Sequence, residues 1–289
     1  KYIFYGMVSI DILYTLKGRR MRVPTLTELF AVVKDAGQII SDNFGLPHDV
    51  TDKSDGTPVT AIDQQINTLF ALLAEKHGIG FIGEEGNGDT DNDWILYVDP
   101  LDGTGAFLRG MATCTVVASI MFMGEPIMAI IHNPITGQTW SAEANNFCSY
   151  WRNKSEGEIL VRTSNLQSVP HRTAICAWPG VDERFLRFQK RILEDSFFLD
   201  QQMGAFAIGG GLIASGLLHT TAISDGSAVE AAAMSLIVRE AGGVAVDLHG
   251  KEILTFAFGE HKNKSDFLLP HGAVFACNMQ VVEALLSFY

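Results

Sequence analysis

The stretch that most constrains the fold is WILYVDPLDGTGAF, residues 94–107. It begins with an apolar run, Trp94 to Val98, that is typical of a buried β-strand. Asp99 and Asp102 follow, beside a proline and a glycine. Because burying a carboxylate is costly unless a partner neutralises its charge, a purely structural role explains this pair poorly. The stretch therefore predicts a strand whose end carries a functional site.

The acidic residues around this stretch favour a hard cation. Further carboxylates lie upstream, at Asp63 in PVTAID and at Glu84 and Glu85 in FIGEEG, and neither His nor Cys occurs in these motifs. A set of oxygen ligands without nitrogen or sulfur suits Mg²⁺, which binds one or two carboxylates and keeps several waters.

The residues after Val98 supply the remaining groups that a phosphate site needs. Pro100 fixes one φ angle, so we expect a tight turn over residues 99–102 that directs both Asp side chains to one point. The carbonyl of Leu101 is a further oxygen ligand. Gly103 and Thr104 offer backbone N–H groups that suit a phosphate oxygen. On these residues alone, a turn with two solvated charges remains the alternative.

The apolar pattern along the chain indicates a mixed α and β protein. Two amphipathic helices, over residues 25–43 and 63–77, precede a short strand at 80–83 and the strand at 94–98. Residues 113–134 predict two strands joined by a Gly-Glu-Pro turn, and a β-meander continues to about 150. We expect further helices over 182–193, 204–218, 227–243 and 280–289, and further strands over 173–178, 243–248 and 272–278.

Composition excludes several classes of protein. A formal net charge of −12 repels phosphate backbones and argues against general nucleic-acid binding. No run of 18 apolar residues occurs, so we expect no membrane span. The four cysteines form no CxxC pair, which argues against a zinc site and a disulfide scaffold and fits a reducing cytoplasm, where we place the protein.

The first residues differ from the rest of the chain. Residues 2–16 are apolar except for an interruption at Asp11, and a basic cluster follows them, which is the reverse of a secretory signal. We interpret residues 1–22 as an N-terminal extension, 23–150 as an α+β half with the acidic motifs, and 151–289 as an α/β half that completes the site.

Four motifs together resemble a known family. WILYVDPLDGTGAF is similar to the D-P-[IL]-D-G-T-x-x-F signature of the inositol monophosphatase superfamily, the magnesium-dependent, lithium-sensitive phosphatases. KSDGTPVTAID, FIGEE and LIVREAGGVAVDL match other motifs of that family, in the right order over about residues 25–280. The resemblance implies a layered αβαβα sandwich and a homodimer. The apolar strands between Thr115 and Ile131 are our candidate for part of the dimer interface.

The resemblance also implies residue roles, with two or three Mg²⁺ ions as cofactor and Mn²⁺ as a possible substitute. Glu84, Asp99 and the Leu101 carbonyl would hold the first ion, and Asp99 and Asp102 would share the second. The Gly103 and Thr104 amides would bind phosphate, while Asp63 and Thr104 would orient the attacking water. Glu84, Asp63 and Thr104 are thus the expected catalytic set, and Asp102, Gly103, Thr104, Gly204 and Ala205 the expected substrate contacts.

The chain departs from the family pattern on the leaving-group side. Members carry Trp-Asp ten residues before the Glu of EAGG, and that Asp completes the second metal site; here these positions are Val229 and Glu230. The family's Gly-Thr-Ala is Gly-Ala-Phe at 204–206. Glu230 is either a metal ligand or only part of a helix cap, because Ser227-x-x-Glu230 matches a capping box. Asp225 is the alternative ligand.

The expected activity is hydrolysis of a phosphate monoester of a small phosphorylated metabolite, namely a polyol, sugar or cyclitol. Histidinol phosphate and a 3′-phosphonucleotide are the alternative substrates. Gly105 and Ala106 stand where nucleotide-specific members tend to carry Lys-Glu, which weighs against the nucleotide. A non-catalytic protein that keeps the fold for binding or regulation is the alternative from another class.

Overall fold

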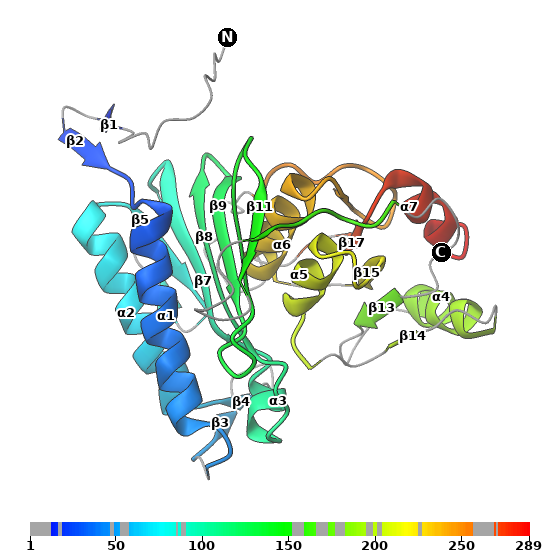
Figure 1. Cartoon of the computed structure of the whole chain (residues 1–289), viewed down its shortest axis with the longest axis horizontal. Helices are drawn as coiled ribbons and strands as arrows, with labels where there is room; N and C mark the ends of the chain where they lie inside the picture. The colour runs from blue at the N-terminus through cyan, green and yellow to red at the C-terminus, as the bar shows by residue number, and fades with distance from the viewer. Residues whose placement is uncertain are drawn as a thin grey trace.

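The computed structural model of the protein describes residues 13–16, 19–46, 49–52, 58–84, 86–87, 91–151, 159–165, 173–176, 183–194, 199–200, 204–224, 227–256, 269 and 271–289. These residues form the five layers that the family resemblance implied (Figure 1). Helices α1 and α2 cover one face of a large sheet, α5 and α6 lie between this sheet and a smaller one, and α4 and α7 cover the far face of the smaller sheet. The αβαβα prediction is confirmed.

Two long helices with strong N-terminal caps form the first layer. They are α1, Leu26–Asn43, and α2, Ala61–His77. Thr25 and Thr60 are the cap residues, and each forms a reciprocal capping box with the acidic residue three positions later. The cap at Thr60 starts α2 two residues before the predicted start, because the box places its acidic residue, Asp63, inside the first turn.

The large sheet carries the motif strand in its interior. Its order is β12-β11-β10-β9-β8-β7-β5-β6, and only the β5–β7 pair is parallel. The bounds are β5 Gly80–Gly83, β6 Gly86–Asn87, β7 Trp94–Asp102, β8 Thr115–Phe122, β9 Glu125–His132, β10 Thr139–Glu143, β11 Cys148–Trp151 and β12 Ile159–Leu160. The predicted meander to about residue 150 is present. The turn between β8 and β9 is Met123-Gly124, so Glu125 and Pro126 already belong to β9.

The predicted tight turn over residues 99–102 is wrong. Strand β7 continues through Pro100 to Asp102, and its register with β8 shifts between Asp99 and Asp102. Proline has no backbone N–H to donate to the neighbouring strand. Pro100 is nevertheless compatible with β7, because it lies in the bulge, where the regular hydrogen bonds between the strands are interrupted. The two carboxylates are therefore positioned by a bulged strand rather than by a turn.

The second half forms the smaller sheet, with the order β14-β13-β15-β17-β16. Its bounds are β13 Thr173–Cys176, β14 Leu199–Asp200, β15 Thr220–Ile223, β16 Val244–Val246 and β17 Ala273–Ala276, and its helices are α4 Glu183–Glu194, α5 Ile208–Ala214, α6 Ala228–Glu240 and α7 Met279–Leu286. Helix α5 is shorter than the predicted 204–218, since a glycine at 204 with φ 85° and one at 216 with φ 70° bound it.

Two pairs of short antiparallel strands and one short helix are the remaining described elements. Strands β1, Leu13–Leu16, and β2, Arg19–Arg22, pair as a hairpin, and β3, Thr51–Asp52, pairs with β4, Pro58–Val59. Helix α3, Thr104–Leu108, follows the motif strand directly. The proposed division at residues 22 and 150 stays a prediction.

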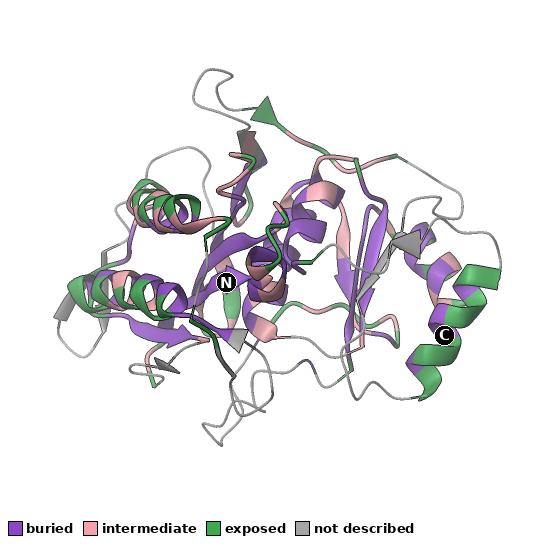
Figure 2. Ribbon diagram, turned by 90° about the horizontal axis from the view of Figure 1, so that it is seen from below, coloured by how far each residue is buried: buried purple, intermediate pink, exposed green. Residues whose placement is uncertain are grey.

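Each pair of neighbouring layers encloses its own apolar core. One cluster lies between α1, α2 and the large sheet, a second surrounds α5 and α6 between the sheets, and a third lies under α4 and α7. Figure 2 shows the central helices largely buried, while the outer helices expose one side. Gly211 of α5 lies so close to Trp140 of β10 that an added Cβ would be 2.3 Å from its ring, which explains the small residues of α5.

Strands β8 and β9 contain our candidate for part of a dimer interface, between Thr115 and Ile131, and most of their side chains are covered within one chain. All of β8 up to Met121 is buried, with α1 on one side and α6 on the other. Met123, at the turn between the two strands, is 67% exposed, and the prediction that these strands form part of an interface stays a prediction. No described helix is both long and apolar enough to cross a membrane.

Candidate metal centre

Three carboxylates from two distant parts of the chain meet at one point. Asp99 and Asp102 lie at the end of β7, and Glu230 lies in the first turn of α6. One carboxylate oxygen from each of the three lies within 4.8 Å of the others. Both aspartates are buried, with 3% and 6% of their surface exposed, and Glu230 is half-buried. The structure thus brings together three of the predicted metal ligands.

Burial and mutual repulsion raise the pKa of every member of this cluster. Burial raises the pKa of Asp99 well above its usual value, and the charges of Glu84, Glu230 and Asp102 raise it further. For the same reasons, burial first and then the charges of Asp102 and Glu84, the pKa of Glu230 is raised to about 8. Burial also raises the pKa of Asp102. Three ionised groups this close are stable together only with a cation between them.

The Glu230 side chain fits a ligand better than a cap. Ser227 caps α6, because its Oγ accepts the N–H of Val229 at 3.1 Å. Glu230 Oε2 is buried, and no hydrogen-bond partner for it occurs in the described part of the chain. A buried carboxylate oxygen without a donor needs a positive partner, so the residues present fit a hard divalent cation. Asp225, the alternative ligand, lies outside the described residues.

Glu84 and Leu101 border the cluster. Glu84 directly follows β5, where its N–H donates to Val98 O at 3.2 Å, and its charge acts on Asp99, Asp102 and Glu230. The Leu101 carbonyl accepts a bond from the Thr104 hydroxyl at 3.0 Å, which leaves a second lone pair on that oxygen. Glu84 is not one of the three carboxylates that lie within 4.8 Å of one another, so its role and that of Leu101 as metal ligands stay predictions.

Asp63 and Thr104, the expected pair for orienting water, are brought together. Asp63 is fully buried in the first turn of α2, and its Oδ2 accepts both the N–H and the hydroxyl of Thr60, at 2.8 and 2.7 Å. Its Oδ1 lies 3.4 Å from the Thr104 hydroxyl. That hydroxyl has one proton and two acceptors, Asp63 and Leu101, so it can change its partner.

The expected substrate contacts from the two halves also meet. Gly103 has φ 84° and caps α3 at its N-terminus. A Cβ at Gly103 would lie 2.7 Å from Gly204 O and 2.8 Å from the Cβ of Ala205. Only glycine allows this backbone conformation together with so close an approach. The segment before α5 therefore packs directly on Gly103, the first residue of the expected phosphate-binding motif.

The sequence analysis missed Thr115, at the start of β8. Its hydroxyl donates to Asp102 Oδ2 at 2.7 Å, while Asp102 also accepts the N–H groups of Phe206 and Ala207. No local pattern marks Thr115, since it lies 13 positions after Asp102 and is placed opposite it only by strand pairing. The backbone donors at 206 and 207 carry no sequence signal at all.

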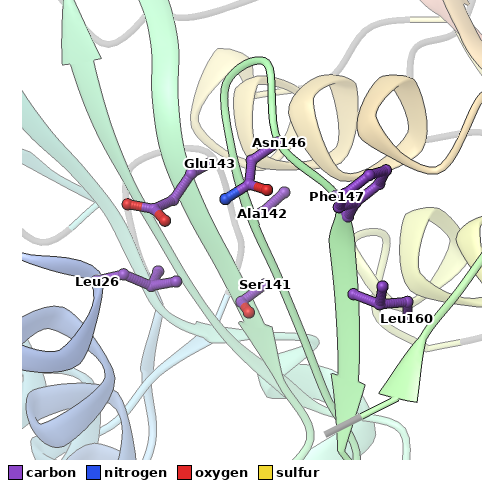
Figure 3. Close-up of a pocket in the computed structure, with 7 residues that line it drawn as sticks. All are labelled: Leu26, Ser141, Ala142, Glu143, Asn146, Phe147 and Leu160. Atoms are coloured by element: carbon purple, nitrogen blue, oxygen red, sulfur yellow. The ribbon is translucent and has the colours of Figure 1, made fainter. Parts of the chain in front are cut away.

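A pocket with no carboxylate of the cluster in its lining lies elsewhere on the large sheet. Figure 3 shows it between the start of α1 and strands β10 to β12. Its volume is about 120 Å³. Its lining residues are Leu26, Ser141, Ala142, Glu143, Asn146, Phe147 and Leu160. The strand register pairs Ser141 with Ile130, and Ile130 with Ala118, which lies near the middle of β8. The carboxylate cluster is contacted instead by Thr115, the first residue of β8. The chemistry described above therefore does not take place in this pocket.

Known proteins resemble this chain over most of its length. The model of the inositol monophosphatase family matches residues 22–286. A histidinol-phosphatase of Mycobacterium tuberculosis is 28% identical over 231 residues, which cover 76% of this chain and 86% of that protein. An inositol-1-monophosphatase of Mesorhizobium japonicum is 27% identical over 277 residues, which cover 92% of this chain and 96% of that protein. The solved Thermotoga maritima IMPase shares the fold, with a TM-score of 0.76, 19% identity and coverage of 91% and 95%.

The fold, the site and these matches define the class of this protein: it is a phosphatase, and so a hydrolase. Since the family model matches all but the two ends of the chain, the protein belongs to the inositol monophosphatase family. Membership implies the use of a divalent metal ion, which agrees with the cluster of Asp99, Asp102 and Glu230.

Proposed function

We propose that the protein is a magnesium-dependent phosphomonoesterase that hydrolyses a small phosphorylated polyol, sugar or cyclitol. The observation that carries this proposal is the buried cluster of Asp99, Asp102 and Glu230, in which Glu230 Oε2 lacks a partner among the described residues. Glu84, Asp99 and the Leu101 carbonyl would hold one ion, and Asp99, Asp102 and Glu230 a second. When bound, such ions supply the positive charge that a phosphate ester needs beside carboxylates and acidify a bound water.

The chain's own groups account for the rest of the work. The N–H groups of Gly103 and Thr104, at the start of α3, are suited to bind phosphate oxygens. The Asp63 carboxylate and the Thr104 hydroxyl lie 3.4 Å apart, so a water beside them that contacts both would be held in a fixed orientation and give its proton toward Asp63. The buried surroundings strengthen each of these polar contacts.

The experiment is turnover of a panel of phosphate esters by the purified protein, with chelator and then with Mg²⁺ or Mn²⁺. Activity should disappear with chelator, return with either ion and decrease in millimolar Li⁺. Turnover that persists without any divalent ion would contradict the metal-dependent mechanism. The absence of turnover on every ester would favour the non-catalytic alternative for this chain.

Histidinol phosphate is the second candidate substrate. The similarity to the Mycobacterium tuberculosis histidinol-phosphatase supports it, and Gly105-Ala106 weigh against a 3′-phosphonucleotide. The values of kcat/KM for histidinol phosphate and for an inositol monophosphate, measured side by side, decide between the two. The homodimer is proposed on the family resemblance alone, and sedimentation at micromolar concentration tests it. The cytoplasmic location is proposed on the cysteine pattern.

A further inference from the structure

Asp102 is held by an unusually complete set of donors. Its Oδ1 accepts Phe206 N–H at 2.9 Å, and its Oδ2 accepts Ala207 N–H at 2.8 Å and the Thr115 hydroxyl at 2.7 Å. A carboxylate offers about four lone-pair sites, so three are used. The remaining site is on Oδ1, which leaves one direction for a cation.

The three donors come from two parts of the molecule. The two N–H groups belong to the segment before α5, which packs against Gly103 from the second half of the chain. Thr115 is the donor within the large sheet, on the strand next to the one that carries Asp102 and Asp99. The Thr115 hydroxyl therefore fixes the position of Asp102 relative to Asp99. Asp99 and Asp102 are the two aspartates that would share an ion.

The position of Thr115 favours this role over simple packing. Thr115 is fully buried and pairs with Asp102 at the point where the β7–β8 register becomes irregular. The register shift lies between Asp99 and Asp102, so the regular ladder does not fix the orientation of one carboxylate relative to the other, and the side-chain bond from Thr115 does so for Asp102. Both the Phe206 N–H and the Thr115 hydroxyl favour the ionised form of Asp102 and oppose the increase in its pKa that burial causes.

We propose that Thr115 is a positioning residue of the metal centre and acts through Asp102 Oδ2. The inference rests on the proposed function, because it assumes that Asp102 is a metal ligand. Partners of metal-ligating carboxylates typically change metal affinity or activity by about 10–100-fold when they are removed. Thr115 has no role in the expected ligand set or in the water-orienting pair, and no family pattern used above includes it.

The test is direct Mn²⁺ binding to the metal-stripped full-length protein, followed by calorimetry, together with the Mg²⁺ dependence of turnover. Thr115→Val keeps the volume and removes the hydroxyl, so it should increase the Kd for Mn²⁺ by about 10–100-fold. The Mg²⁺ concentration for half-maximal activity should increase by the same factor, and saturating Mg²⁺ should restore most of kcat. Thr115→Ser keeps the hydroxyl and should bind Mn²⁺ like the wild type.

A matched control comes from the smaller sheet. Thr220 is fully buried on β15, and within the described residues its hydroxyl has no hydrogen-bond partner. Thr220→Val makes the same chemical change away from the cluster and should leave the Kd for Mn²⁺ unchanged. If Thr115→Val does not fold, Thr115→Ala and Thr115→Ser provide the same comparison, since they differ only in the hydroxyl.

The outcomes separate this inference from the proposed function. Equal Mn²⁺ affinity in the wild type and in the variants without a hydroxyl would overturn the role of Thr115 and leave the metal centre intact. A wild type that binds no Mn²⁺ would overturn the proposed function and this inference with it. A loss of affinity in Thr115→Ser as large as in Thr115→Val would assign the effect to packing of the methyl group, and would also overturn the proposal.

Discussion

Removal of divalent ions should make the folded protein less stable as the pH increases from 5 to 8. In the metal-free protein, burial and the charges of Asp102 and Glu84 raise the pKa of Glu230 from 4.5 to about 8. The unfolded chain loses this proton near pH 4.5, whereas the folded chain keeps it up to about pH 8. Between these values the folded state binds more protons, so its stability is fully present below pH 4.5 and is lost as the pH approaches 8.

The size of the effect follows from the pKa difference. Each pH unit between the two pKa values lowers the free energy of unfolding by about 1.4 kcal/mol. An increase from pH 5 to pH 8 therefore lowers it by up to about 4 kcal/mol. For a chain of this length, 1 kcal/mol corresponds to roughly 2 °C in Tm. We therefore expect the Tm of the chelator-treated protein to decrease by up to about 8 °C over this range because of Glu230. Saturating Mg²⁺ should remove most of the decrease, because the cation replaces the proton.

The dependence of Tm on pH is measured by thermal unfolding at pH 5, 6, 7 and 8, followed by circular dichroism, once with chelator and once with Mg²⁺. Glu230→Gln removes one of the titrating groups and should make the curve recorded with chelator less steep, while Asp99 and Asp102 keep part of the pH dependence; the variant should also lose much of the stabilisation by Mg²⁺. Glu75→Gln, at an exposed position of α2, is the control and should behave like the wild type. The reasoning is refuted if wild type and Glu230→Gln show the same pH dependence. Loss of the Mg²⁺ effect only in Asp225→Asn would identify Asp225 as the ligand.

Three further outcomes are expected. Asp63→Asn should lower kcat by about 10²–10⁴-fold while Mn²⁺ binding persists, which would separate water orientation from metal binding in the same preparation. Burial of His132, with a smaller effect of Lys34, lowers its pKa to about 3, so stability present above pH 6.5 should be lost on acidification, by about 2.7 kcal/mol at pH 4.5. Urea unfolding of the wild type and of His132→Gln checks this, and equal losses would contradict it. Gly211→Ala, whose Cβ would meet the Trp140 ring, should cost about 1–3 kcal/mol of unfolding free energy, and an unchanged urea midpoint would show that α5 can move away.

Sequence patterns predicted those parts of the fold that depend on neighbouring residues. The helix over 25–43 was predicted from its period and is present as α1, because its apolar stripe and its Thr25 cap are local features. The carboxylates at 99, 102 and 230 were likewise marked by motifs, and the structure brings them within 4.8 Å of one another. Motif order along the chain was sufficient to predict that distant segments meet.

Features that depend on pairing between strands were not predictable in this way. The backbone at 99–102 looked like a turn because Pro and Gly are typical of turns, yet the neighbouring strand β8 extends the ladder through it as a bulge. Thr115 was missed for the same reason, since register alone places it opposite Asp102. The covering of β8 by α1 and α6 was not predictable either, because an apolar strand looks the same whether a helix or a second chain covers it.

The two helices that deliver site carboxylates do so in the same way. Asp63 is the third residue of α2 and Glu230 the third residue of α6, so each lies in a first turn, where the helix dipole favours a negative charge. The helices differ in how the cap is made. In α2 the carboxylate itself completes the capping box through one oxygen and keeps the other for Thr104.

In α6 the Ser227 hydroxyl accepts the Val229 N–H, and Glu230 Oε2 has no donor within the described residues. An acidic residue at the third position of a helix therefore does not identify a cap by itself. What decides its role is whether its oxygens are used by the cap, and at Glu230 one of them faces other carboxylates instead. The capping-box pattern at Glu230 thus coexists with the proposed ligand role, because Oε2 takes no part in the cap.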